Sequence, residues 1–350
     1  MPWQLGVLWP ATTGGGDCDV LTQEGSVAVA AQNHFHICAF GDYLFIPGGG
    51  NSTVRSIDVT DRANPVAADT LTDPTDTELF NMRGVATDGD WLYVTGEEGV
   101  VVGDFLFTIV NVSDPTNMTI EGSVTSASFG LGRGVAVQGD FCYVVAGPGG
   151  NFLVVDVSDR TDPQIVGSVS LFSESSDVIA DGNFCYVTCS GTDRVVSIDV
   201  SVPTAPVVED SEIDATTLDG CTGMALFGDV LFVAVTTGDR LTAIDVSDPS
   251  NLAQISSLAD TDFDGISGVA LTADGTRAVV GSYVIGDWVT LVDVSDPSAM
   301  VILDTIANND DYSLRLTRLD GYFYGTDAAG VHSVHTWFIE GCGGGSGWSL

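Results

Sequence analysis

Residues 132–171 read GRGVAVQGDFCYVVAGPGGNFLVVDVSDRTDPQIVGSVSL. Four short runs rich in β-branched and aromatic residues, GVAV, FCYVV, FLVVDV and QIVGSVSL, are separated by Gly-Asp, Gly-Pro-Gly-Gly and Ser-Asp-Arg-Thr-Asp-Pro. Short apolar runs bounded by turn-forming residues are typical of β-strands. The stretch therefore predicts one four-stranded antiparallel unit.

The same unit recurs along the chain with a period of about 42 residues, which lies in the range of propeller and solenoid repeats. Alignment on the Gly-Asp hairpin and the Asp-Val-Ser-Asp-Pro turn places copies at residues 34–73, 82–126, 132–172, 175–217, 221–262 and 266–309. A seventh copy, residues 312–340, ends after its third strand, and residues 25–30 (GSVAVA) match the missing fourth strand. We therefore predict an all-β fold, a seven-bladed β-propeller closed by an N-terminal strand that completes the last blade.

This arrangement divides the chain into an N-terminal apolar and Gly-rich arm (residues 1–24), the propeller (residues 25–340) and a Gly-rich C-terminal tail (residues 341–350). The arm contains Trp3 and Trp9, and apolar side chains on such a segment often contact a partner surface. We expect the terminal segments either to bind other subunits of a larger assembly or to pack back onto the propeller. Whether Cys18 and Cys342 form a disulfide between them is left open.

The pattern Leu-Val-Val-Asp-Val-Ser-Asp, followed by Pro and a Val-Gly-Ser strand, resembles the LVIVD-repeat propeller family over nearly all of residues 25–340. The resemblance implies the propeller fold. Members of that family are commonly surface-associated, and the family pattern carries no catalytic residues that could be transferred to this chain. The recurring aspartates of the turn are interpreted as structural, because Asp side chains accept hydrogen bonds from nearby backbone N–H groups.

The charge is strongly acidic, with a formal net value of −38 at pH 7, and all ten basic residues are Arg. Since 44% of the residues are hydrophobic, the chain has enough apolar side chains to bury a large core. The absence of Lys and the abundance of Asp indicate adaptation to molar salt; an acidic mesophilic surface or a calcium-loaded protein is the alternative. Nucleic acid is excluded as a partner because phosphate contacts need clustered cations. Membrane insertion is not expected, because no run of about 18 apolar residues occurs.

One face of the predicted propeller gathers arginines around the channel mouth. The residues that directly precede the innermost strands are Phe35, Arg83, Arg133, Ser176, Thr222, Ser267 and Arg315. Loops between the second and third strands add Arg55, Arg194 and Arg240 to the same face. Guanidinium groups bind carboxylate and sulfate through paired hydrogen bonds, so these six arginines predict a site for an acidic ligand such as a cell-surface glycan or glycoprotein. The alternative is that each Arg pairs with a nearby Asp and ties blades together.

A cation site is the second candidate. Asp260, Asp262 and Asp264 open a calcium-loop motif (DTDFDG), although its twelfth position is Leu271 and not the Glu that completes an EF-hand. The four histidines, His34, His36, His332 and His335, fall in the first and last blades, where two pairs could hold a transition metal. No cofactor is required by the sequence, and calcium is the candidate ion.

These observations favour a non-enzymatic structural and recognition protein of an extracellular assembly. The most concrete form is a virion component (a tail, baseplate or capsid-surface protein, with a role in host attachment) of a virus of halophilic archaea. The N-terminus lacks the features of a secretory signal, and virion proteins leave the cell by lysis. Two alternatives remain: a protein-interaction scaffold at the surface or in the cytoplasm of a halophilic cell, and a glycan-active lyase or hydrolase that uses the Arg-lined mouth.

The charge generates a direct prediction. Repulsion among acidic groups destabilises the fold in dilute buffer, whereas molar salt shortens the Debye length to about 3 Å. We therefore expect the thermal unfolding midpoint, measured by circular dichroism, to rise steeply between dilute buffer and molar KCl. A midpoint that does not depend on salt would contradict the adaptation to molar salt.

Overall fold

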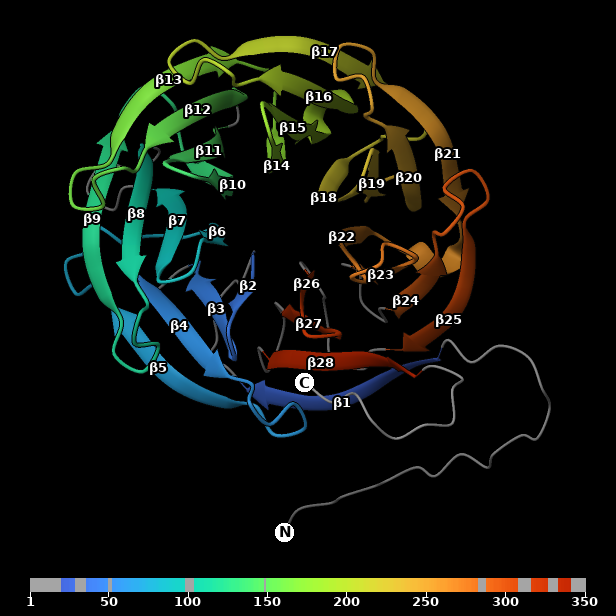
Figure 1. The fold of residues 1–350 in the computed structure, drawn as a ribbon, viewed down its shortest axis with the longest axis horizontal. Helices are drawn as coiled ribbons and strands as arrows, with labels where there is room; N and C mark the ends of the chain where they lie inside the picture. Colours follow the sequence, from blue (N-terminus) through green and yellow to red (C-terminus); the bar gives the residue numbers. More distant parts are fainter. Residues whose placement is uncertain are drawn as a thin grey trace.

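Seven four-stranded antiparallel sheets surround a central axis in the computed structural model, which confirms the predicted seven-bladed β-propeller (Figure 1). The structure describes residues 20–28, 36–49, 52–97, 104–147, 149–282, 288–307, 316–326 and 333–340; at positions 288, 307 and 340 it describes the backbone alone. Phe35, Arg315, His34, His332, Cys18 and Cys342 lie outside these residues, as do most of the predicted arm and the tail.

The blades follow one another along the chain, and within each blade the strands run from the axis outward (Figure 1). Blade 1 comprises β2 (Cys38–Phe40), β3 (Tyr43–Gly48), β4 (Thr53–Asp58) and β5 (Val66–Thr72). Blade 2 comprises β6 (Gly84–Thr87), β7 (Trp91–Glu97), β8 (Phe105–Asn111) and β9 (Thr119–Ser126). Blade 3 comprises β10 (Gly132–Gln138), β11 (Phe141–Ala146), β12 (Asn151–Asp156) and β13 (Gln164–Ser170). Blade 4 comprises β14 (Ser175–Asp181), β15 (Phe184–Cys189), β16 (Arg194–Asp199) and β17 (Val207–Ile213).

Blade 5 comprises β18 (Cys221–Phe227), β19 (Val230–Val235), β20 (Arg240–Asp245) and β21 (Ala253–Ala259). Blade 6 comprises β22 (Ile266–Leu271), β23 (Arg277–Ser282), β24 (Trp288–Asp293) and β25 (Val301–Ala307). Blade 7 comprises β26 (Leu316–Leu319), β27 (Tyr322–Thr326), β28 (Ser333–Glu340) and, outermost, β1 (Val20–Ala28). Two short 3-10 turns, η1 (Ser190–Thr192) and η2 (Thr261–Phe263), complete the described elements.

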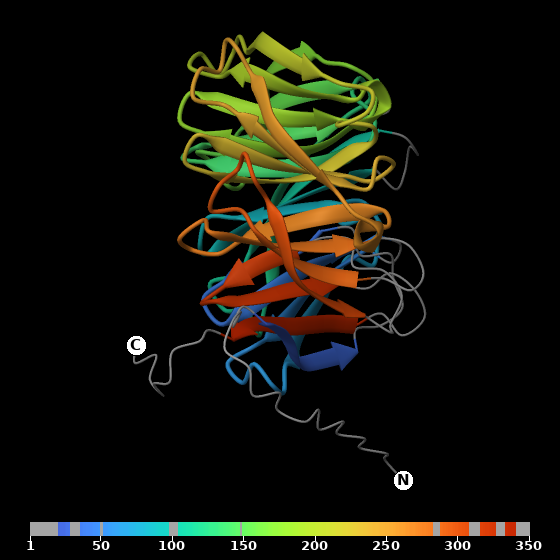
Figure 2. The ribbon, with the colours of Figure 1, turned by 90° about the vertical axis from the view of Figure 1, so that its right-hand side faces the viewer.

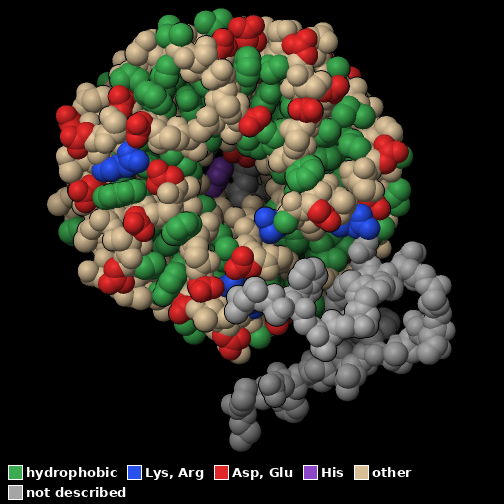
Figure 3. All heavy atoms as spheres, in the orientation of Figure 1, with side chains coloured by type: hydrophobic (Ala, Val, Ile, Leu, Met, Phe, Trp, Pro, Cys, Tyr) green, Lys and Arg blue, Asp and Glu red, His purple; other side chains and the backbone are tan. Residues whose placement is uncertain are grey.

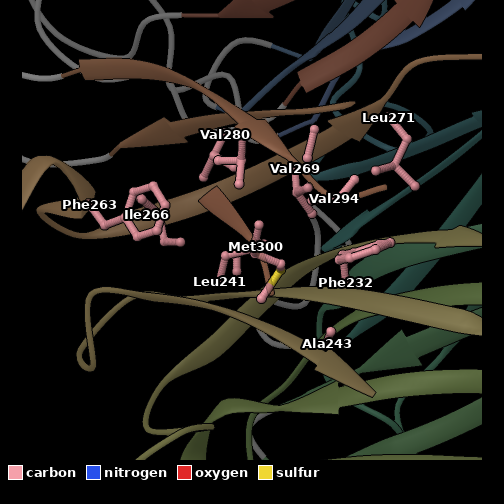
Figure 4. Packing of buried hydrophobic residues seen from close by; sticks show 13 residues of the cluster. Phe232, Leu241, Ala243, Phe263, Ile266, Val269, Leu271, Val280, Val294 and Met300 are labelled. Carbon is pink, nitrogen blue, oxygen red and sulfur yellow. The ribbon is translucent and has the colours of Figure 1, made fainter. Parts of the chain in front are cut away.

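The core consists of the contacts between neighbouring blades. The middle strands read as continuous apolar runs, such as Leu44-Phe45-Ile46, because both faces of each sheet are covered. Figure 4 shows the contact between blades 5 and 6, where Phe232 packs in one cluster with Val269 of the next blade. Burial of these side chains is the dominant stabilising contribution to the ring.

Blade 7 closes the ring with strands from both ends of the described chain. Strand β1 pairs antiparallel with β28 from Val20 to Ala28, and the two strands lie side by side in Figure 1. The predicted closing strand is confirmed, but it begins at Val20, so the boundary of the propeller lies at residue 20 and not at residue 25. Asp304 Oδ2 accepts the N–H of Leu21 at 2.8 Å, as Asp69 Oδ2 accepts that of Met118 in blade 2. Strand β1 therefore takes the position of a regular fourth strand.

The turns between third and fourth strands are built by their aspartates. Asp248 Oδ1 accepts the N–H of Ser250 at 3.1 Å and its hydroxyl at 2.7 Å, and Asp296 Oδ1 accepts the same groups of Ser298 at 3.0 and 2.6 Å. These contacts confirm the structural interpretation of the recurring Asp residues. The gold and orange-red turns of blades 5 and 6 lie along the left edge of Figure 2, which is the face seen in Figure 1. Figure 3 shows the central opening and the many acidic side chains of this Asp-turn face.

Some of the arginines tie blades together on the Asp-turn face. Arg160 of blade 3 lies 3.3 Å from Asp88 Oδ2 of blade 2, and its guanidinium carbon lies 5.7 Å from the centre of the Tyr93 ring. Arg62 of blade 1 reaches Asp320 of blade 7 at 3.3 Å. Arg62 and Arg160, which are not among the six arginines of the predicted site, therefore tie neighbouring blades together.

The described cysteines are small core residues. Cys142 and Cys185 are fully buried at the same position of blades 3 and 4, as the repeat predicts. Burial raises the pKa of both thiols well above the ordinary value, so they remain protonated.

One buried carboxylate organises the loop between blades 1 and 2. Asp73 Oδ2 accepts the N–H groups of Thr77 and Glu78, both at 2.7 Å, and Oδ1 accepts the N–H and hydroxyl of Thr75 at 2.9 and 2.6 Å. Burial by itself raises the pKa of Asp73, but the hydrogen bonds from Thr75, Glu78 and Thr77 outweigh it and lower the pKa to about 2. The ionised carboxylate therefore stabilises the fold above its ordinary pKa, and this contribution is lost as the pH falls toward 2.

We predict that Asp73→Asn lowers the free energy of unfolding at pH 7 by about 2 kcal/mol, because an amide offers one acceptor oxygen in place of two. Urea denaturation of both proteins should show this difference shrinking between pH 4 and pH 2, as the wild-type carboxyl becomes protonated. Asp90→Asn is the matched control, since Asp90 is exposed and its side chain makes no hydrogen bond to any described residue. An equal loss in both variants would contradict the role of Asp73.

Candidate functional site

The predicted ring position at the start of the innermost strands is marked by a β-bulge. In β10 the pairing with β11 shifts between Gly132 and Val135, so Arg133 lies in the irregular part of the strand. The same shift occurs at Ser176 of β14, Thr222 of β18 and Ser267 of β22. A bulge bends its strand and redirects a side chain, and it therefore sets the direction of the residue at this position in four blades.

Arg83 and Arg133 are brought together by Thr95 of blade 2. The backbone oxygen of Thr95 accepts the N–H of Arg83 at 2.7 Å, and its hydroxyl donates to the backbone oxygen of Arg133 at 3.0 Å. A Cβ atom on Gly84 would lie 1.9 Å from that same oxygen, so the close approach of the two innermost strands requires Gly. One residue, through its backbone oxygen and its hydroxyl, thus fixes the spacing of both arginines across the boundary between blades 2 and 3.

The two guanidinium groups influence one another. Burial, followed by repulsion from Arg133, lowers the pKa of Arg83, while attraction from Glu97 raises it. Glu97 is buried and its Oε2 accepts a hydrogen bond from Asn81 Nδ2 at 2.7 Å. Arg133 forms no ion pair or hydrogen bond with any described side chain, and its Nε atom is buried without an acceptor among the described residues.

The other three described arginines of the predicted site lie apart from this pair. Arg55, Arg194 and Arg240 belong to the third strands β4, β16 and β20, farther from the axis than β6 and β10 (Figure 1). Burial lowers the pKa of Arg55. The guanidinium of Arg194 stacks 3.7 Å from the centre of the Phe172 ring. Arg194 therefore has an aromatic partner in the segment that joins blades 3 and 4.

Aspartates also populate the face that carries these arginines. Asp193 Oδ1 accepts the N–H of Gly220 at 3.1 Å, and Asp239 Oδ1 accepts that of Gly265 at 2.8 Å. Hydrogen bonds from Thr217 and Thr216, with a smaller contribution from the charge of Arg240, lower the pKa of Asp214. The face that carries the arginine pair therefore carries charges of both signs.

Blades 4 to 6 place hydroxyl groups where blades 2 and 3 place arginines. Ser176 Oγ lies 3.0 Å from Ser190 Oγ, and Thr222 Oγ1 lies 3.0 Å from Thr236 Oγ1. Thr222 Oγ1 is also 3.3 Å from the backbone oxygen of Ser267. The sequence predicted the ring positions Ser176, Thr222 and Ser267, but not the neighbouring hydroxyl groups of Ser190 and Thr236, which come from a different loop. These five residues are called the hydroxyl arc. Ser190 and Thr236 each directly follow the second strand of their blade, and this shared position could have identified them from the sequence.

The calcium motif does not assemble three ligands. Asp260 Oδ1 accepts the N–H of Asp262 at 3.1 Å and caps η2, while Asp262 Oδ2 lies 3.3 Å from the hydroxyl of Thr305. Phe263 between them is fully buried in the core. No group of three or more His, Cys, Asp or Glu side chains suited to a metal ion occurs among the residues that the structure describes.

The described histidines do not change this result. The ring of His335 is buried, stacks 5.7 Å from that of Trp337, and its Nδ1 lies 3.0 Å from Gln23 Nε2 of β1. His335 therefore contributes to the packing of the closing blade. Its predicted partners His34 and His332 fall outside the described residues.

The comparisons with known proteins agree with this architecture. The family model of the LVIVD repeat matches residues 81–126, 130–170, 174–211, 222–260 and 278–307. The WD40 β-propeller domain of Doa1 is similar with a TM-score of 0.69 at 10% identity, covering 91% of this chain and 97% of that chain. A functionally unknown protein from Desulfotomaculum acetoxidans gives 0.66 at 10% identity, covering 82% and 89%. No curated protein matches significantly. Similarity at this identity shows the fold alone.

No helix among the described residues has the length and apolar character needed to cross a bilayer.

We predict that calcium leaves the stability of the protein unchanged. Since Asp260 and Asp262 are engaged in local contacts, the unfolding midpoint in molar KCl, where screening by salt is already strong, should be the same with added CaCl₂ and with EDTA. A cation present at 100 times its Kd would instead stabilise the fold by about 2.7 kcal/mol. A calcium-dependent rise in the midpoint that disappears in Asp262→Asn would show that the carboxylates bind the ion together.

Proposed function

Because the chain belongs to the LVIVD repeat family and forms a closed propeller, we propose that it is a non-enzymatic structural and recognition protein of an extracellular assembly. The repeat and the fold indicate a role in protein interaction or structure. The finer proposal is a virion component of a virus of halophilic archaea, a tail, baseplate or capsid-surface protein that takes part in host attachment. A cellular scaffold of a halophile is the alternative location for the same role.

One observation carries the assembly role: the two ends of the ring meet. Val20, the first residue of β1, pairs with Glu340, the last residue of β28. Residues 1–19 and 341–350, which both contain Trp and Gly-rich stretches, are therefore attached to the propeller at one point. In each of the other blades, the turn between the third and fourth strands occupies the corresponding position. Two apolar segments attached together offer a partner subunit one combined contact.

Composition supports an environment of molar salt. The net charge of −38 with Arg as the only basic residue suits a protein exposed to high ionic strength. A role in binding and not in catalysis is supported by the recurring aspartates, because their oxygens accept hydrogen bonds within their own turns.

Light scattering in molar KCl tests the proposal, with the full chain compared with a chain that starts at residue 20. Truncation at residue 20 keeps β1, which the ring needs, and removes only the preceding segment. We expect the full chain to form a higher oligomer and the shortened chain to be a folded monomer of about one chain mass. Trp3→Ser with Trp9→Ser is the matched variant of full length and should also be monomeric. A monomer in all three forms would refute the assembly role of the N-terminal segment.

A further inference from the structure

We propose that Arg133, with Arg83 beside it, binds the carboxylate of an acidic sugar at the channel entrance between blades 2 and 3. The site lies on the face opposite to the Asp-turn face, because both residues are at the start of an innermost strand. It is narrower than the six-arginine site expected from the sequence: among the described arginines of that site, Arg83 and Arg133 are the two whose backbones Thr95 holds at one blade boundary.

The backbone around the pair is fixed before any ligand arrives. Thr95 holds both arginine backbones through its own oxygen and its hydroxyl, at 2.7 and 3.0 Å. A Cβ atom on Gly132 would lie 2.7 Å from Thr95 Cβ, so the neighbouring strand is packed directly against Thr95. Binding groups that are held in place by the fold lose little freedom when a ligand binds.

Arg133 supplies the hydrogen-bond donors for a ligand. Its Nε atom is buried and has no hydrogen-bond acceptor among the described residues, and none of its guanidinium nitrogens forms an ion pair with them. A buried donor without an acceptor is uncommon in folded proteins, and a bound water or ion is one of its regular explanations. A planar guanidinium matches a carboxylate through two parallel hydrogen bonds.

Arg83 contributes positive charge to the same place. Glu97, whose Oε2 accepts a hydrogen bond from Asn81 at 2.7 Å, attracts Arg83 and helps to position it. Because Arg133 repels Arg83, an anion between the two guanidinium groups relieves this repulsion. In a chain with a net charge of −38, a pair of adjacent arginines reduces the repulsion that an acidic ligand meets.

The hydroxyl arc favours a sugar over a simple acid. The innermost strands β14, β18 and β22 continue around the channel from β10 (Figure 1) and bring Ser176, Thr222 and Ser267 to the same level of their blades. Ser190 and Thr236 add further hydroxyl groups next to them. Hydroxyl groups both donate and accept hydrogen bonds, and they therefore suit the hydroxyl groups of a saccharide.

The choice of a sugar as the ligand rests on the proposed recognition role. The site itself does not involve the terminal segments. The chain that starts at residue 20 should therefore bind the ligand as the full chain does. Loss of oligomer formation with retained binding, or the reverse, separates the two proposals.

Ligand-observed NMR titration in molar KCl tests the site with D-glucuronate as the probe, and with acetate and D-glucose as fragments. We expect glucuronate to bind at least tenfold more tightly than either fragment. Arg133→Gln should weaken glucuronate at least tenfold, and Arg133→Lys should also weaken it because the paired hydrogen bonds are lost. Arg83→Gln gives an independent variant should Arg133→Gln fail to fold.

Arg318→Gln is the matched control, since Arg318 lies in the innermost strand of blade 7 away from the pair. It should leave glucuronate binding unchanged, and circular dichroism melting verifies the fold of every variant. Unchanged affinity in both Arg133→Gln and Arg83→Gln would refute the site. Equal affinity for acetate and glucuronate would refute the assignment to a sugar, and binding of acidic peptides in preference to glucuronate would do the same.

Discussion

The structure depends on burying both faces of every blade. The middle strands are apolar on both sides, so a blade is stable only between two neighbours, and the ring must close. Closure depends on β1, which pairs with β28 along its length and receives the same carboxylate contact at Leu21 that Met118 receives in blade 2. The ends of the propeller are thus joined by hydrogen bonds and packing, in the place where the other blades have a covalent turn.

The acidic residues have two opposing effects on this ring. Asp114, Asp159 and Asp296 accept hydrogen bonds from hydroxyl and N–H groups two residues ahead, and these bonds lower the pKa of each carboxyl. The same ionised groups add to a net charge of −38. The turns therefore need charges whose mutual repulsion opposes folding, and high ionic strength removes the repulsion while leaving these short hydrogen bonds in place. The composition and the turn chemistry are consistent with one another.

The blades differ from one another at positions that the repeat leaves free. The strands and turns are nearly identical from blade to blade, whereas the bulge at the start of the innermost strand carries Arg133, Ser176, Thr222 or Ser267. The bulge is part of the scaffold, and the side chain that it presents can vary without affecting the core. This division agrees with the general observation that function resides in sites carried by a fold and not in the fold itself.

The sequence by itself determined the seven blades, the closing strand and the buried cysteines, because each follows from a pattern of neighbouring residues that repeats along the chain. It placed the start of β1 at Gly25, because Gly25-Ser26-Val27 matches the Gly-Ser-Val run of other blades, whereas the pairing with β28 extends back to Val20. Only the tertiary structure decided which arginines meet. Arg83 and Arg133 belong to different blades, and the spacing of their backbones depends on Thr95 of β7. Likewise, the DTDFDG motif has the letters of a cation loop, but burial of Phe263 and the cap formed by Asp260 direct its carboxylates into separate contacts. The distance between side chains of different blades depends on how the blades pack, and a local sequence pattern does not predict it.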